Sequence, residues 1–292
     1  MSSVEAGAAT EAQALYDAGD FERSRTVAVG ALAESPDDIE LLLIAGRATL
    51  ELEPEASVAY FERAANIQPE NAELWDELGD VLLQLNQASA ATSAFREVIR
   101  LQPDDPGGLV DLAHAAYVAG RSDEAIESLT RAVEQDPGNR SALRALVDIH
   151  SREGRAEAAL GAAAALSEQA TDDVLALIDV AALSLQLDRL DEAVAAYSRL
   201  QKVDDDPEHE VYPYYGMIQA ELRRDGWRRA LDLAIDATRV DRLGRTTDVL
   251  AFVVAQVFGT ADRPAPPRAE VEAALADSQD EHRRLHAQAL AF

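Results

Sequence analysis

Two histidines near the end of the chain are the first residues whose spacing suits a chemical role. His282 and His286 lie one helical turn apart, beside Asp280 and Glu281. Such a pair on one helix face can hold a divalent metal ion. The order differs from the HExxH pattern of zinc peptidases, and the sequence places no third ligand. We expect no metal or other cofactor, and keep a metal-dependent enzyme or sensor built on this pair as an alternative interpretation.

The remaining polar clusters give no catalytic pattern. Asp204, Asp205, Asp206 and Glu208 lack the alternating ligands and central glycine of a calcium loop, which indicates a solvated turn. The chain has no phosphate-binding glycine loop, no GxSxG elbow and no HxE…PCxxC pattern. It has no cysteine, and therefore no disulfide, thiolate metal site or cysteine nucleophile. The sequence predicts a protein that is not an enzyme.

The clearest structural signal is the stretch from Ala72 to Asp105, which reads as two amphipathic helices joined by a tight turn. Apolar residues recur at helical spacing in both halves, and Pro103 closes the stretch because proline cannot continue a helix. One such pair cannot bury both apolar stripes, so it needs similar neighbours. The expected core positions are Leu74, Trp75, Leu78, Leu82 and Leu85, followed by Ala91, Ala94, Phe95, Val98 and Leu101.

Closing prolines show that this unit repeats. Pro36, Pro69, Pro103 and Pro137 are separated by 33, 34 and 34 residues. Small residues such as Gly79 are expected where two helices cross closely, and Pro54 is expected in a turn. The units are 5–37, 38–71, 72–105, 106–139, 140–173, 174–206 and a last one with Tyr212, Gly216 and Ala230, in which the spacing to the second helix reads as two residues longer.

The repeated unit resembles the tetratricopeptide repeat (TPR). The family pattern is matched by Trp75, Leu78, Gly79, Ala91, Phe95 and Pro103, while Leu82 stands where the pattern usually has Tyr. The resemblance covers residues 5–243 and implies an all-α superhelical α-solenoid of six to seven TPR-like helical hairpins. We expect residues 244–292 to form C-terminal capping helices, because the end of a solenoid needs a polar outer face.

The resemblance also implies a groove lined by the first helix of each pair, from the second, fifth, ninth and twelfth places of each unit. These places hold Glu73, Asp76, Asp80 and Leu83, then Val110, His114 and Tyr117, then Ser141, Arg144, Asp148 and Ser151. Chaperone-binding TPR proteins hold a terminal carboxylate with Lys, Arg and Asn, and the acids here disfavour that ligand. A basic or mixed apolar peptide suits this groove better; the alternative is that these side chains face only water.

A second candidate patch lies at 223–229, the only dense basic cluster in the sequence. It contains Arg223, Arg224, Trp227 and Arg228, and three tyrosines precede it at 212, 214 and 215. Tyr, Trp and Arg are over-represented at the centres of interfaces. The alternative is that Trp227 fills the last core while the arginines pair with nearby acids. The patch can also meet the acidic repeats of another copy in a head-to-tail contact.

The chain is strongly acidic, with 54 Asp and Glu against 26 Lys and Arg in 292 residues and a net charge of −28. Residues 1–208 hold 41 acidic and 15 basic residues, whereas residues 209–292 hold 13 and 11. This surface either serves solubility or captures a basic partner, and it repels nucleic acid and anionic membranes. No apolar run reaches the roughly 20 residues of a membrane-spanning helix. With no secretory signal at its start, the sequence predicts a cytoplasmic location.

These observations predict a non-catalytic adaptor or scaffold that receives a segment of a partner protein in its groove. The alternative of the same kind is a self-associating structural scaffold, in which residues 223–229 of one copy meet the acidic repeats of another. Neither nucleic acid nor a membrane is expected as a partner.

Overall fold

The computed structural model describes residues 3–204, 206 and 211–240, with side chains described for 7–204, 206 and 211–237. All regular structure in these ranges is α-helical. The chain divides into two compact units, Met1–Ala142 and Leu143–Phe292. The capping helices predicted at 244–292 and the His282–His286 pair lie outside the described residues.

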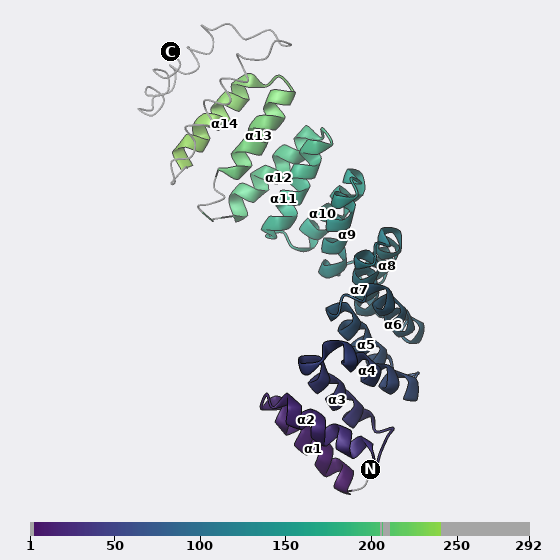
Figure 1. Ribbon diagram of the computed structural model, residues 1–292. Coiled ribbons are helices and arrows are strands. Elements are labelled where there is room, and N and C mark those ends of the chain that lie inside the picture. Colours follow the sequence, from purple (N-terminus) through teal and green to yellow (C-terminus); the bar gives the residue numbers. More distant parts are fainter. Residues whose placement is uncertain (1–2, 205, 207–210, 241–292) are drawn as a thin grey trace. The chain divides into compact units, whose positions relative to one another are not determined.

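Within the described ranges the helices pair into hairpins, each made of a first helix (A) and a second helix (B), as Figure 1 shows. The A helices are α1 (Ser3–Asp17), α3 (Ile39–Leu52), α5 (Ala72–Gln84), α7 (Pro106–Val118), α9 (Arg140–Arg152), α11 (Val174–Gln186) and α13 (Tyr212–Arg223). The B helices are α2 (Phe21–Leu32), α4 (Pro54–Ile67), α6 (Ala88–Leu101), α8 (Ser122–Gln135), α10 (Ala156–Gln169), α12 (Leu190–Val203) and α14 (Trp227–Val240). This pairing confirms the predicted all-α repeat of helical hairpins.

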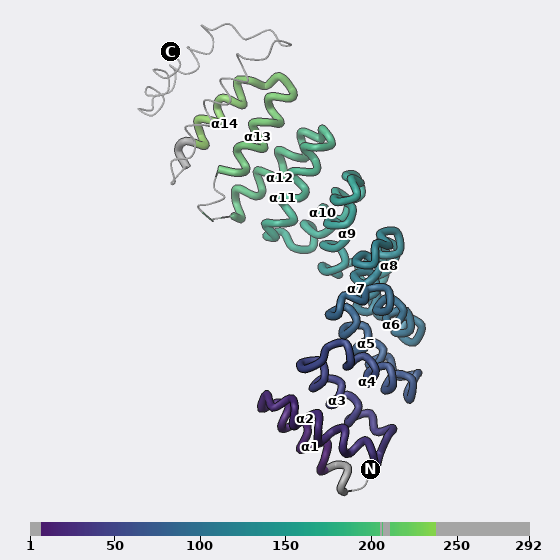
Figure 2. Tube along the Cα trace, in the orientation of Figure 1, coloured from purple at the N-terminus to yellow at the C-terminus, as the bar shows by residue number. Residues whose placement is uncertain are grey.

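Hairpins that follow one another in the chain are neighbours in space within each unit, as the colour sequence of Figure 2 makes visible. The α5–α6 hairpin buries Leu74, Leu78 and Leu82 from its A helix. From its B helix it buries Ala91, Ala94, Phe95 and Val98. Trp75, Leu85 and Leu101 are half-buried at the margins. The core therefore lies between the A and B helices and continues from one hairpin to the next.

Small side chains allow the two helices of a hairpin to approach closely. A Cβ atom added to Gly79 in α5 would lie 2.6 Å from ring carbons of Phe95 in α6. Gly46 in α3 stands in the same relation to Phe61 in α4, at 2.9 Å. Aromatic rings thus fill the space that these glycines leave open, as the expectation for Gly79 requires.

Each hairpin is bounded by local signals that fix where its helices begin and end. Asp38, Asn71, Asp105 and Asp173 precede A helices, and their side chains accept backbone N–H bonds of the first turn. Six of the described A helices are followed by a left-handed residue, which is Gly19, Gly120 or Gly154 in three hairpins and Asn86, Asp188 or Asp225 in three others. At Asn86 the following N–H, that of Gln87, donates to the carbonyl of Leu82, which is the Schellman arrangement.

Two details differ from the sequence interpretation. Pro54 is the first residue of α4 and not a turn residue, because the first position of a helix needs no N–H donor and suits the fixed φ of proline. The last hairpin is also not lengthened between its helices. In the α5–α6 hairpin, Gly79 lies seven residues before the left-handed residue Asn86. In the last hairpin the left-handed residue is Asp225, and the position seven residues before it is Ile218. The position equivalent to Gly79 is therefore Ile218 and not Gly216.

Gly216 has a different role from that of Gly79. It lies against the ring of Tyr197 in α12, so it makes room for a side chain of the preceding hairpin. Tyr197 is buried and makes an edge-to-face contact with Tyr212, with ring centroids 5.9 Å apart. Gly216 thus serves a contact between hairpins, whereas Gly79 serves one within its own hairpin.

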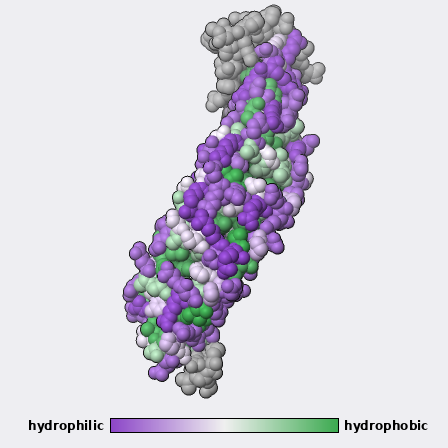
Figure 3. Space-filling model, turned by 90° about the vertical axis from the view of Figure 1, so that its right-hand side faces the viewer, coloured by the Kyte–Doolittle hydropathy of each residue, from purple (hydrophilic) through white to green (hydrophobic). Residues whose placement is uncertain are grey.

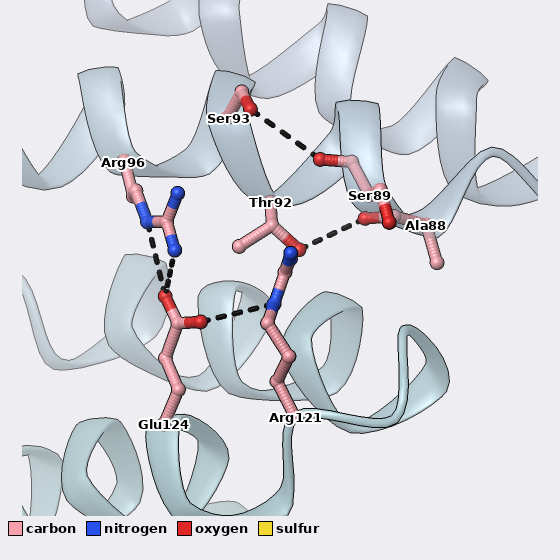
Figure 4. A network of polar contacts seen from close by, with 7 residues as sticks. All are labelled: Ala88, Ser89, Thr92, Ser93, Arg96, Arg121 and Glu124. Carbon is pink, nitrogen blue, oxygen red and sulfur yellow. Dashed lines mark hydrogen bonds and ion pairs between the residues drawn. The ribbon is translucent and has the colours of Figure 1, made fainter.

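Ion pairs join the B-helix sides of neighbouring hairpins. Arg96 in α6 contacts Glu124 in α8 through both Nε (3.0 Å) and Nη2 (2.6 Å), and Arg121 approaches the same carboxylate at 3.0 Å. Figure 4 shows this Arg96–Glu124–Arg121 group beside the hydroxyl of Thr92, which donates to the carbonyl of Ala88. The Arg96–Glu124 pair thus links the B helices of two successive hairpins.

Candidate functional site

Neighbouring A helices are linked by arginines that neutralise carboxylates. In the first unit, Nε of Arg47 in α3 lies 2.6 Å from Oε1 of Glu77 in α5. In the second unit, Arg144 in α9 donates from Nη1 to Asp179 in α11, and its Nη2 lies 3.6 Å from Asp173. Glu77 and Asp179 occupy the same place, the sixth of their units, which begin at residues 72 and 174.

The third acid at the sixth place of an A helix is Asp111 in α7, and it lacks such a partner. Two further carboxylates reach the same region from α5, those of Asp76 and Asp80, and Asp105 precedes α7. Within the described part of the chain, Asp76, Asp80 and Asp111 form no hydrogen bond or ion pair. We call Asp76, Asp80, Asp105 and Asp111 the aspartate site.

The electrostatics of the aspartate site favour protonation. Partial desolvation raises the pKa of Asp111 to about 6, and the negative charges of Asp76, Asp80 and Asp105 act in the same direction. The charge of His114 opposes this effect. The pKa values of Asp76 and Asp80 are raised as well, first by desolvation and then by neighbouring acids. A nearby cation would lower all three pKa values.

The structure brings together only part of the predicted groove residues. Asp76 and Asp80 lie near each other and near Asp111, while Asp148 acts electrostatically on Asp179 beside Arg144. Among the other predicted groove residues, exposed side chains are those of Glu73, His114, Ser141 and Ser151, and half-buried ones are those of Leu83, Val110 and Tyr117. Their contact with a partner stays a prediction.

Sequence reasoning missed Asp111 because only four places of each unit were taken as groove positions. Asp111 stands at the sixth place of its unit, in α7. There it lies close enough to Asp76 and Asp80, at the fifth and ninth places of the preceding unit, for their charges to raise its pKa. A signal was present in the sequence, since the sixth place is also acidic at Glu77 and Asp179.

The second predicted patch, residues 223–229, makes several contacts within its own unit. Arg224 lies 2.6 Å from Asp191 in α12 and 3.0 Å from Glu221, and Arg223 donates to the carbonyl of Leu185. Trp227 packs half-buried against the core of α11–α14, with the guanidinium carbon of Arg228 5.1 Å from its ring centroid. These contacts match the intramolecular interpretation, and a role of the patch in partner binding stays a prediction.

The described residues contain no group of three or more His, Asp or Glu side chains arranged to hold a metal ion. No helix in the same ranges combines the length and apolar character that crossing a bilayer requires. The surface in Figure 3 is mostly hydrophilic, with apolar residues in small separate areas.

Repeated antiparallel helix pairs with a shared core define the α-solenoid class of repeat proteins. Two models of the tetratricopeptide repeat family match this chain, one at residues 82–148 and 116–178 and the other at 53–106. Residues 53–178 therefore consist of tetratricopeptide repeats. Such repeats form scaffolds for protein interactions, and the family is in general not catalytic.

Relatives of known name are distant. The Protein CTR9 homolog of Arabidopsis thaliana is 24% identical over 160 residues, which are 54% of this chain and 14% of that protein. The chain therefore matches about one seventh of that relative's length. The YrrB structure, described as a TPR protein with an unusual peptide-binding site, is 15% identical, with a TM-score of 0.51 over 66% of this chain and 96% of its own. A MamA RS-1 double mutant is 20% identical, with a TM-score of 0.51 over 58% and 96%. At these identities the two structures indicate the fold alone.

Proposed function

We propose that the A-helix face of the first unit binds a basic or mixed apolar segment of a partner protein, and that the chain acts as a non-catalytic adaptor in the cytoplasm. The observation that carries the proposal is the contrast among the three acids at the sixth place of A helices. Glu77 and Asp179 are each held by an arginine of the preceding A helix, whereas Asp111 is surrounded by further aspartates.

Charge repulsion at the aspartate site is the physical reason to expect an external cation. Bringing like charges together without a counter-charge costs stability, and a basic segment that lies across α5 and α7 would remove that cost on binding. Half-buried Leu83, Val110 and Tyr117 belong to the same two helices and can supply apolar contact to such a segment. The peptide-binding site named for YrrB shows that a relative of this fold takes a peptide ligand, and we extend that use to this chain.

Selection from a random peptide library tests the proposal without assuming the sequence of the partner segment. We expect peptides enriched on the wild-type chain to carry net positive charge and apolar residues, and to shift the amide resonances of α5 and α7. A selection that enriches acidic or uncharged peptides would contradict the proposal, as would resonance shifts confined to B helices.

A further inference from the structure

The aspartate site has a counterpart in the second unit that differs at one of its four positions. Its four positions recur 68 residues later, as the pairs Asp76 and Arg144, Asp80 and Asp148, Asp105 and Asp173, and Asp111 and Asp179. Asp105 and Asp173 both cap the following A helix through their side chains. The acids at 76, 80 and 105 raise the pKa of Asp111, and the residues at their counterpart positions 144, 148 and 173 act on the pKa of Asp179. The two sets therefore occupy equivalent places in their units, although His114 near Asp111 is replaced by Ala182 in the second unit.

In the second unit this set of positions holds a guanidinium group. Arg144 donates to the carboxylate of Asp179 and reaches toward Asp173 at 3.6 Å, while the charge of Asp148 acts on the same pair. One guanidinium group thus contacts two carboxylates, that of Asp173, which caps α11, and that of Asp179 within α11. The equivalent set in the first unit has Asp76 where this arginine stands, so no residue of that set supplies a cation to its carboxylates.

We propose that the aspartate site takes the guanidinium group of an arginine side chain supplied by a partner protein. The inference rests on the proposed function, because it names the group by which a basic segment is recognised. Two independent observations carry it: the unpaired carboxylates of Asp76, Asp80 and Asp111, and the bound guanidinium in the equivalent set of the second unit.

The chemistry of the site favours arginine over lysine. A guanidinium presents five N–H donors in a planar fork and can bridge separate carboxylates, whereas an ammonium is a compact and strongly hydrated point charge. The carboxylates come from α5, from α7 and from the cap residue Asp105, so they are spread over more than one element. Arg47 provides a further example, since its guanidinium links α3 to Glu77 of α5.

The test uses two blocked tripeptides, acetyl-Gly-Arg-Gly-amide and acetyl-Gly-Lys-Gly-amide, titrated into the full chain and followed by amide resonances. We expect the arginine peptide to bind about tenfold more tightly than the lysine peptide, a difference of about 1.4 kcal/mol. Asp76→Arg places an internal guanidinium at the register of Arg144, so we expect it to weaken arginine-peptide binding at least about tenfold. Its thermal midpoint should equal or exceed that of the wild type, which excludes unfolding as the cause.

A gain-of-function variant supplies the matched control. Arg144→Asp empties the equivalent set in the second unit, and we expect new arginine-peptide shifts in α9 and α11 while those in α5 and α7 remain. Equal affinities for the two tripeptides, or an Asp76→Arg variant that binds as well as the wild type, would overturn the guanidinium inference. The proposed function would survive either result if the library still enriched basic peptides, and would fail only by its own test.

Discussion

The pKa of Asp111 reflects the charges and the desolvation around its carboxyl group. Its pKa in the folded chain is about 6, above the 3.8 of an ordinary aspartate, because partial desolvation and three neighbouring aspartates disfavour its charged form. The folded state therefore binds more protons than the unfolded state between these two values. Stability must fall as the pH rises through this window, and the repulsion is fully present above about pH 6.

Replacing Asp111 by Asn should remove this repulsion. We expect Asp111→Asn to stabilise the chain at pH 7.5 by on the order of 0.5 kcal/mol, a value reduced by solvent screening of an exposed side chain. At pH 4 the gain should vanish, because the wild-type carboxyl is then mostly protonated when folded. Urea unfolding at the two pH values measures the difference.

Asp104→Asn is the matched control for that experiment, since it removes an equal charge from the loop before α7. Its effect on stability should not follow the same pH window. If Asp111→Asn destabilises the chain at pH 7.5, the carboxylate of Asp111 is held by a favourable contact and the aspartate site is not open.

At the scale of elements, the hairpins depend on close approach of A and B helices. Gly79→Ala puts a methyl group within 2.6 Å of the Phe95 ring, so the helices or the ring must shift. We expect a loss of about 1–3 kcal/mol from overpacking, although alanine has the higher helix propensity. Chemical denaturation of the variant measures the loss.

Gly30→Ala is the comparison for Gly79→Ala, because a Cβ atom added at Gly30 in α2 meets nothing within 4 Å. Here the helix propensity of alanine should dominate and raise stability by up to about 1 kcal/mol. If both variants were stabilising, close helix packing would not be the reason for the glycine in α5.

Residue types predict the positions of the helix pairs well and the composition of the aspartate site poorly. Prolines between hairpins, Asp and Asn before A helices and glycine at three turns are local signals, so the helix pairs could be predicted from residue types alone. Asp111 could not be singled out in this way, because its importance depends on how α7 is rotated against α5. The neighbour of Gly216 also depends on how hairpins pack together, since this glycine meets Tyr197 of the preceding hairpin.

At the scale of the whole molecule, uneven charge raises the question of self-association. Residues 1–208 carry most of the negative charge, and the basic cluster lies at 223–229. Arg223 and Arg224 already contact Leu185, Asp188 and Asp191 of their own unit. We therefore expect the molar mass from light scattering to stay that of one chain at both low and high salt. A mass that falls toward one chain as salt is added would favour the self-associating scaffold.

The central claim is that the aspartate site receives a basic segment of a partner, and calorimetric titration of a library-selected peptide tests it most directly. Asp80→Lys in α5 and Glu127→Lys in α8 change the net charge equally, and both residues are exposed. We predict that Asp80→Lys weakens binding about tenfold or more, while Glu127→Lys changes it little, because only the first reverses a charge at the site. Equal losses for the two variants, or undiminished binding to Asp80→Lys, would contradict the account.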